Sequence, residues 1–273
     1  MTSTTTSNKI KDIILYCVGI VIVLLIISLI GLIKDNSIVF PSAFEIIKSF
    51  FGLFSEGDTY IFIGNTLLDF IISLLFSIII GFSLGTLAGF NNNVRMVLKP
   101  LMVMLRSLPM IILIVIVMLI IPNNNYRHVP YIATTLTITP IIYEGIAEGI
   151  KGVDRQYIDV YRLNSNLNTK VIFRVYYPLI KGYINQALVN AIGMGIKIIV
   201  ACEYLAGIRN TLGNAIYNSK ILIEYTDIYA YAILLVLIVV LVELLPKLII
   251  CIINAIKRRK NNNLNKENEI NKA

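Results

Sequence analysis

Seven ionisable residues lie within apolar stretches of the sequence, and their types and positions could support chemistry or transport. They are Asp69, Arg106, Glu144, Lys197, Glu203, Glu243 and Lys247. A charged side chain inside a bilayer is costly, so such residues pair with one another, reach the interface or line a path for a substrate or an ion. Each of these alternatives predicts a different position for the side chain.

Candidates for a translocation pathway come from this set: Arg106, Glu144, Lys197 and Glu203. Lys197 lies mid-stretch with no opposite charge three or four positions away, so it must face protein or water. Two interpretations stay open, a partner on another helix, for which Glu144 is a candidate, and a cation that faces a substrate. Arg106 and Asp69 lie near the ends of their stretches, so snorkelling to the interface would also explain them.

Glu243 and Lys247 are four residues apart on one helical face, so we expect them to neutralise each other.

Residue patterns typical of catalysis or metal binding are missing from the sequence. His128 is the only histidine, which excludes an HExxH zinc site and a multi-His metal centre. Cys17, Cys202 and Cys251 lie in apolar segments without close pairing, so neither a disulfide framework nor a metal site is indicated. No Gly-Lys dipeptide occurs, so there is no Walker A loop. We expect a non-catalytic chain without a cofactor, and any ATP must be bound by another chain.

The elements that must position these residues are membrane helices. Hydrophobic residues make up 57% of the 273 positions and charged residues 15%, against about 25% charged residues in a soluble domain. The apolar runs approach the roughly 20 residues that span a bilayer. The sequence predicts an all-α membrane protein with six transmembrane helices, at about 13–33, 64–90, 98–121, 129–149, 183–206 and 228–252.

The orientation follows from the distribution of basic residues. With the N-terminus inside, sixteen Lys and Arg residues fall in inner segments and five in outer loops, and positive loops stay cytoplasmic. We therefore expect a multi-pass protein of the plasma membrane with both termini in the cytoplasm. The net charge of +8 does not indicate nucleic-acid binding, because no basic face is interleaved with aromatic residues.

The chain divides into three parts. Residues 1–39 hold an N-terminal tail and the first span, 40–258 form the main transmembrane domain, and 259–273 are predicted to be a disordered cytoplasmic tail. Within the second part, residues 43–54 place Phe44, Ile47, Phe51 and Phe54 on one face, which predicts an interfacial helix.

Small residues recur every four positions in the second predicted span, including Ser77, Gly81, Gly85 and Gly89. Such a face allows close backbone approach, and we expect it to pack against another helix, within the bundle or across a dimer. Pro109 and Pro140 interrupt the third and fourth spans, which predicts kinks there.

The longest predicted cytoplasmic loop, residues 151–181, has a helical pattern without spanning hydrophobicity. Asp154 is a candidate N-cap, residues 164–166 form a turn, and a second short helix runs towards Pro178. The spacing resembles the EAA loop of ABC importer permeases. The positions that match the motif are Asp159, Val160, Tyr161, Ser165, Val175, Tyr177 and Pro178. Only Pro178 is identical, and Ser165 stands where the family has a turn glycine.

Three further stretches resemble the nitrate, sulfonate, taurine and thiamine-precursor branch of this family: Phe40-Pro41-Ser42, the segment 105–109, and Ala201-Cys202-Glu203 followed by Thr211-Leu212-Gly213. The resemblance covers about residues 40–258. It implies a type I importer with a second permease copy, cytoplasmic ATPase subunits and an extracytoplasmic binding protein. The loop would then couple the ATPase to the bundle, with Asp159, Tyr161 and Arg162 facing the ATPase. The cargo would be a small anion or a thiamine-precursor-like solute.

Two rival interpretations remain open at this stage. Intramembrane charges would also suit an ion-coupled secondary transporter or a channel, although no inverted repeat is visible. A membrane-bound enzyme would need clustered catalytic groups near one membrane face, whereas the acidic residues here are scattered.

Overall fold

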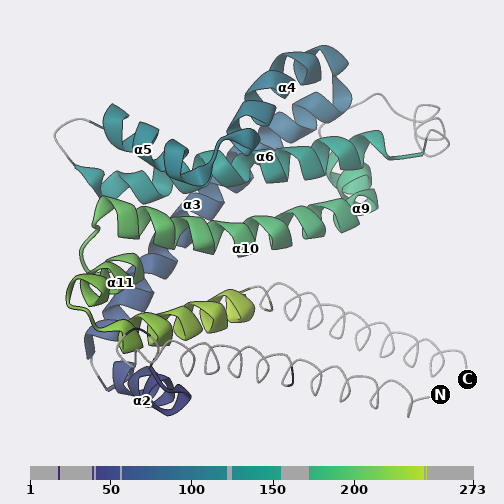
Figure 1. Ribbon diagram of the computed structural model, residues 1–273. Coiled ribbons are helices and arrows are strands. Elements are labelled where there is room, and N and C mark those ends of the chain that lie inside the picture. Colours follow the sequence, from purple (N-terminus) through teal and green to yellow (C-terminus); the bar gives the residue numbers. More distant parts are fainter. Residues whose placement is uncertain are drawn as a thin grey trace, which may run out of the picture.

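The computed structural model of the protein (Figure 1) describes residues 18, 39, 41–55, 57–121, 125–154, 172–242 and 244. These residues form helices and no strand, which confirms the predicted all-α class. The helices are α2 (Ala43–Leu53), α3 (Gly57–Phe90), α4 (Asn92–Ser107), α5 (Met110–Ile120), η2 (Tyr126–His128), α6 (Val129–Lys151), η3 (Ile172–Tyr176), α9 (Tyr177–Leu179), α10 (Lys181–Ala206), α11 (Leu212–Ile221) and a last helix, Tyr225–Val242.

Three of these helices, α3, α10 and Tyr225–Val242, are long and apolar enough to cross a membrane. The bent pair α4 and α5 makes a fourth if it counts as one span. The first predicted span, 13–33, lies outside the described residues except for Val18, and so do the tail 259–273 and residues 155–171 of the long loop.

The predicted third span, 98–121, consists of two helices, and the interruption predicted at Pro109 is confirmed. The chain turns by 105° between α4 and α5, at Leu108 and Pro109. Proline has no backbone N–H and disfavours a helical conformation in the residue before it, so α4 stops at Ser107 and a new helix starts at Met110. Pro140, where the sequence predicts a second interruption, does not end the helix: α6 continues through Pro140 as one helix.

The centre of the fold is α6, which packs along α3 and α10 more extensively than any other pairs of elements do. Its buried side chains include Ile138, Ile142 and Ile146, each fully inaccessible. Figure 1 shows α6 and α10 running side by side while α3 crosses them.

The small-residue face of α3 lies against α6. A Cβ at Gly81 would meet the Ile142 Cβ at 2.8 Å, and one at Gly85 would meet the Tyr143 carbonyl oxygen at 2.8 Å. A Cβ at Gly89 would likewise meet the Ile150 Cβ at 2.8 Å. Ser77 is buried and donates to the carbonyl oxygens of Ser73 and Thr135. The glycines are therefore used inside one chain, where they let two helix backbones touch.

Helix α2 begins with a capping box at Ser42. The Ser42 hydroxyl accepts from the Glu45 backbone N–H at 3.3 Å, and the Glu45 carboxylate accepts from the Ser42 N–H at 2.8 Å. The hydrogen bond between these residues lowers the pKa of the Glu45 carboxyl. Phe44, Ile47 and Phe51 are exposed along one side of α2, as an interfacial helix requires.

A tight corner joins α10 to α11. Gly207 ends α10 with φ of 63°, and Asn210 has φ of 59°, both left-handed conformations that glycine and asparagine adopt most easily. Gly213 follows in the first turn of α11, where a Cβ would lie 2.5 Å from the Glu203 Cβ and from the Val200 carbonyl oxygen. The corner thus brings α11 into backbone contact with the end of α10.

Candidate functional site

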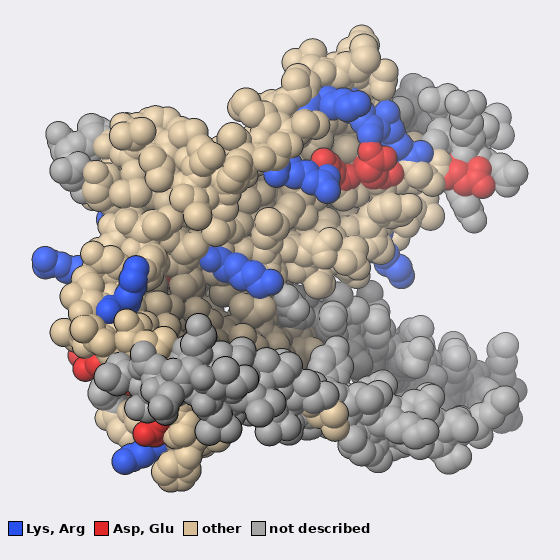
Figure 2. Space-filling view, in the orientation of Figure 1, with Lys and Arg blue, Asp and Glu red and all other residues tan. Residues whose placement is uncertain are grey.

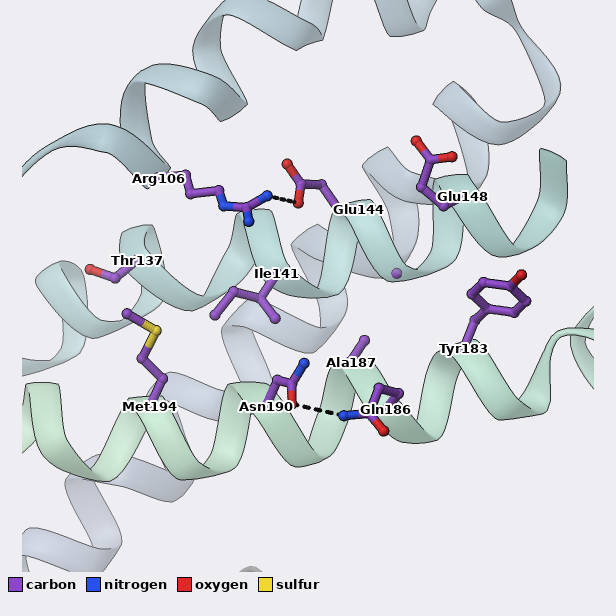
Figure 3. Close-up of a pocket in the computed structure, with 11 residues that line it drawn as sticks. Arg106, Thr137, Ile141, Glu144, Glu148, Tyr183, Gln186, Ala187, Asn190 and Met194 are labelled. Atoms are coloured by element: carbon purple, nitrogen blue, oxygen red, sulfur yellow. Dashed lines mark hydrogen bonds and ion pairs between the residues drawn. The ribbon is translucent and has the colours of Figure 1, made fainter. Parts of the chain in front are cut away.

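A cavity of about 640 Å³ lies between α4, α6 and α10 (Figure 3). The side chains with polar groups that line it are Arg106, Thr137, Glu144, Glu148, Tyr183, Gln186 and Asn190. Two of the four residues predicted for a translocation pathway, Arg106 and Glu144, therefore meet in one cavity.

Two ion pairs connect α4 to α6 beside this cavity. The Arg106 guanidinium donates to the Glu144 carboxylate at 2.5 Å, and Arg95 pairs with Glu148. Figure 2 shows basic and acidic side chains gathered over this part of the molecule, whereas the other charged side chains on this face are scattered. Both pairs are partly exposed, and exposed pairs contribute about 0–1 kcal/mol in water. We therefore expect these pairs to add little to the stability of the fold and mainly to set how α4 lies against α6.

The partners of three charged residues differ from those expected. Glu144, the candidate partner named for Lys197, pairs instead with Arg106. Arg106 and Asp69 do not simply snorkel, because each forms an ion pair within the chain. Helix rotation and tilt decide which charges meet, and neither can be read from linear spacing.

Lys197 is exposed on α10 and makes no hydrogen bond or ion pair with any residue that the structure describes. It continues a line of exposed residues on this helix, Gln186, Asn190 and Met194, at intervals of three or four. The Gln186 amide donates to the Asn190 carbonyl oxygen at 3.0 Å. This face of α10 is too polar for contact with lipid alone. Sequence reasoning missed Gln186 and Asn190, although their four-residue spacing in an apolar helix was a visible signal.

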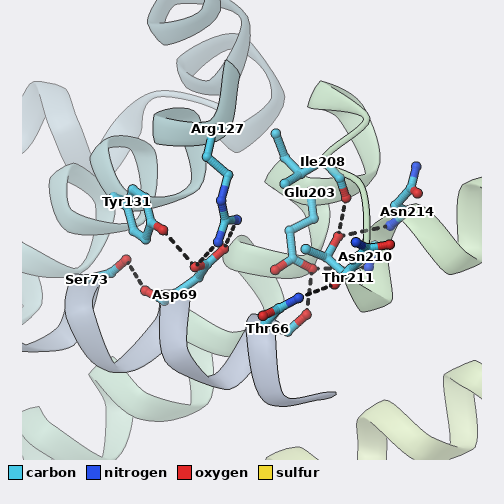
Figure 4. A network of polar contacts seen from close by, with 12 residues as sticks. Thr66, Asp69, Ser73, Arg127, Tyr131, Glu203, Ile208, Asn210, Thr211 and Asn214 are labelled. Carbon is cyan, nitrogen blue, oxygen red and sulfur yellow. Dashed lines mark hydrogen bonds and ion pairs between the residues drawn. The ribbon is translucent and has the colours of Figure 1, made fainter. Parts of the chain in front are cut away.

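A second group of polar residues lies at the end of the bundle where α3, η2, α6 and α11 meet (Figure 4). Asp69 is fully buried and accepts two hydrogen bonds from Arg127, at 2.6 and 3.0 Å. The Tyr131 hydroxyl donates to the same carboxylate at 2.8 Å. Burial alone would lower the pKa of Arg127, but hydrogen bonding and the charge of Asp69 outweigh it and raise that pKa. This pairing has no local signal in the sequence, since Arg127 lies in a predicted loop 58 positions from Asp69.

Glu203 belongs to this second group and does not line the cavity. It is fully buried, and its Oε2 atom accepts from the Thr66 hydroxyl at 2.9 Å and from the Gly213 N–H at 3.1 Å. The Thr66 hydroxyl in turn accepts from the Leu212 N–H at 3.1 Å. Glu203 therefore ties the first turn of α11 to α3.

The structure describes the two ends of the predicted coupling loop, residues 151–154 and 172–181. Asp159, Val160, Tyr161, Arg162 and Ser165 lie outside the described residues. Val175 is half-buried in η3, and Pro178 is exposed in α9. The Tyr177 hydroxyl shares a 2.7 Å hydrogen bond with the Thr86 hydroxyl, and its ring packs edge-on against Phe82. The end of the loop is thus attached to α3.

Comparisons with known proteins agree with this architecture. The model of the family described as binding-protein-dependent transport system inner membrane component matches residues 74–255. Two curated relatives match, both named bicarbonate transport system permease protein CmpB, from Synechococcus elongatus and from Synechococcus sp.. Each is 30% identical over 125 residues, which are 46% of this chain and 44% of the relative. The match therefore spans less than half the length of these relatives.

Proposed function

Because the chain belongs to the binding-protein-dependent transport system inner membrane components, we propose that it forms the translocation pathway of an ABC importer for a small oxyanion. As a member of this family it is a membrane permease component and not a catalytic subunit. The family match over residues 74–255 is the observation that carries the proposal.

The proposed membrane topology has six spans, with both termini and the loop 151–181 in the cytoplasm. The distribution of Lys and Arg supports this orientation. In it, the cavity between α4, α6 and α10 opens near the cytoplasmic side, and the Asp69–Arg127 pair lies near the outer side. ATPase subunits would bind the loop from the cytoplasm, and an extracytoplasmic binding protein would deliver cargo from the other side.

The proposed pathway runs along the polar face of α10 and into the cavity. At the cavity the cargo would contact Asn190, Gln186 and Arg106. Lys197 lies about one to two helical turns away along α10 and would contact the cargo before it reaches the cavity. A second permease copy would close the open side of this face. The proposed pathway leaves out Glu203, because its carboxylate is buried between α3 and α11.

The proposed cargo class rests on two supports. The curated relatives are named for bicarbonate transport, and Lys197 is a cation without a carboxylate partner among the residues described. A planar or tetrahedral oxyanion such as bicarbonate, nitrate or a sulfonate fits both. ATP is bound by the partner subunits, and this chain would carry no cofactor of its own.

The direct test is uptake into proteoliposomes that contain the complete transporter. We expect uptake of labelled bicarbonate, nitrate or a sulfonate that requires both ATP and the binding protein. Uptake that persists without ATP and follows an imposed ion gradient would instead identify an ion-coupled secondary transporter.

Coupling is tested by Asp159→Lys. We expect this charge reversal to abolish co-purification of the ATPase subunit while the permease still inserts, because Asp159 stands at the acidic position of the EAA-like spacing. Asp58→Lys, an exposed acidic residue at the start of α3, is the matched control. Retained ATPase binding by Asp159→Lys would show that the contact lies elsewhere.

A further inference from the structure

The two carboxylate oxygens of Glu203 differ in their hydrogen bonding. Oε2 accepts two hydrogen bonds, from the Thr66 hydroxyl and the Gly213 N–H. Oε1 is buried and has no hydrogen-bond partner among the residues that the structure describes. An ionised carboxylate accepts through both oxygens and is strongly penalised when one is left unpaired away from water. The surroundings therefore suit a carboxyl group that carries no charge.

The neighbouring charges lead to the same conclusion. Asp69 lies one turn beyond Thr66 on α3, and Arg127 on η2 gives two hydrogen bonds to it. Tyr131 on α6 also donates to Asp69, and none of these groups donates to Glu203. On α11, Lys220 lies over the Tyr204 ring at 5.8 Å and is exposed. Among the described residues, Arg127 is the cation of this polar group and it pairs with Asp69, so an ionised Glu203 would leave a buried net negative charge.

We propose that Glu203 is a neutral carboxylic acid in the folded chain, with its proton on Oε1, and that this uncharged group holds α11 against α3. Oε2 remains an acceptor for Thr66 and Gly213, as in the structure. An unpaired neutral hydroxyl costs much less than an unpaired charge. The site is therefore a buried proton-binding position, separate from the proposed cargo pathway.

The close packing of the corner determines where the Glu203 carboxyl group lies. Gly213 approaches the Glu203 Cβ so closely that no side chain fits between α10 and α11. The carboxyl group then lies between α3 and the first turn of α11, within reach of the Gly213 N–H. A helix N-terminus presents several unpaired N–H groups, and Glu203 satisfies one of them where water is excluded.

The proposal is tested by infrared spectroscopy of the full-length chain, assembled with its partner subunits in lipid. We expect a protonated carboxylic acid carbonyl band at neutral pH that disappears in Glu203→Gln. Glu224→Gln, which changes an exposed carboxylate, should leave the band in place. Absence of the band in the unchanged protein would overturn the proposal.

Thermal stability supplies a second readout that does not depend on cargo. Glutamine has the shape and the hydrogen-bonding oxygen of the neutral acid, so Glu203→Gln should melt within experimental error of the unchanged protein. Glu203→Ala should melt at a clearly lower temperature, because it leaves the Thr66 hydroxyl and the Gly213 N–H unpaired. If Glu203→Ala does not insert, the Glu203→Gln result alone decides. A loss in Glu203→Gln that equals that of alanine would show that the charge is required.

Discussion

At the scale of single residues, Asp69 and Arg127 form a pair whose two members differ in their access to water. The Asp69 side chain is fully buried, whereas that of Arg127 is 42% exposed. Removal of either partner breaks the same contact but leaves different groups behind. A buried carboxylate left alone is much more costly than a guanidinium that can turn towards solvent.

We therefore predict that Arg127→Ala destabilises the protein by about 3–5 kcal/mol, the range found when one partner of a buried ion pair is removed. Asp69→Asn should cost clearly less. Arg209→Ala, at an exposed arginine, is the control. Unfolding of the purified variants in detergent measures the difference, and a larger loss for Asp69→Asn would contradict this account.

Lys197 is the residue on which the proposed oxyanion cargo can be tested. Lys197→Gln should reduce uptake about tenfold or more, because a hydrogen bond to a charged group is worth roughly 1.5–3 kcal/mol. Stability should not fall, since Lys197 has no partner among the described residues. Lys48→Gln, at an exposed lysine on α2, controls for loss of charge. Normal uptake by Lys197→Gln would remove it from the pathway.

Single-residue environments were only partly predictable from the sequence. The cost of intramembrane charge was enough to select Arg106, Glu144, Lys197 and Glu203 as candidates. Their partners depend on which faces of separate helices meet, and residues 38 positions apart such as Arg106 and Glu144 carry no local signal of contact. Glu203 was placed in the pathway by the same rule, and the structure puts it between α3 and α11.

At the scale of elements, the contact between α3 and α6 depends on the absence of side chains at glycines. Gly85 lies against the Tyr143 carbonyl oxygen and Cα, which are backbone atoms and cannot move aside as a side chain can. Gly64 lies on the same helix with nothing within 4 Å of a Cβ position. The two glycines form a matched pair for substitution.

Gly85→Ala should separate α3 from α6 and lower stability by roughly 1–3 kcal/mol, the usual cost of overpacking. Gly64→Ala should be neutral or stabilising by up to about 1 kcal/mol, because alanine is the better helix former. Melting temperatures of the two variants, each compared with the unchanged protein, check both expectations. Equal effects of the two substitutions would show that the close approach at Gly85 is unimportant.

Periodicity predicted the elements themselves better than their geometry. The four-residue repeat of small side chains identified the packing face of α3, but the sequence left open whether it meets another helix of the bundle or a second copy. Pro109 marked the interruption of the third span, because proline lacks the N–H that a helix needs. The 105° angle between α4 and α5 depends on what each helix packs against, and composition does not encode that.

At the scale of the whole molecule, the orientation in the membrane follows from loop charge and can be tested by labelling. In a chain whose native cysteines are replaced, Lys220→Cys should react with an impermeant maleimide added to intact cells. Lys151→Cys should react only after the membrane is opened. Both lysines are exposed in the structure, so access to the reagent depends on the membrane side alone. The reverse pattern would invert the proposed topology.

The length of α3 has a mechanical consequence for the assembled protein. Its 34 residues measure about 51 Å at 1.5 Å per residue, whereas the hydrocarbon core is about 30 Å thick. The helix must therefore tilt or project beyond the bilayer. Phe82, Thr86 and Phe90, all near its end, contact Tyr176 or Tyr177. A movement of the segment before α9 would be transmitted through these contacts to α3. Because α3 is one continuous helix, the movement would extend to its other end, on the opposite side of the membrane.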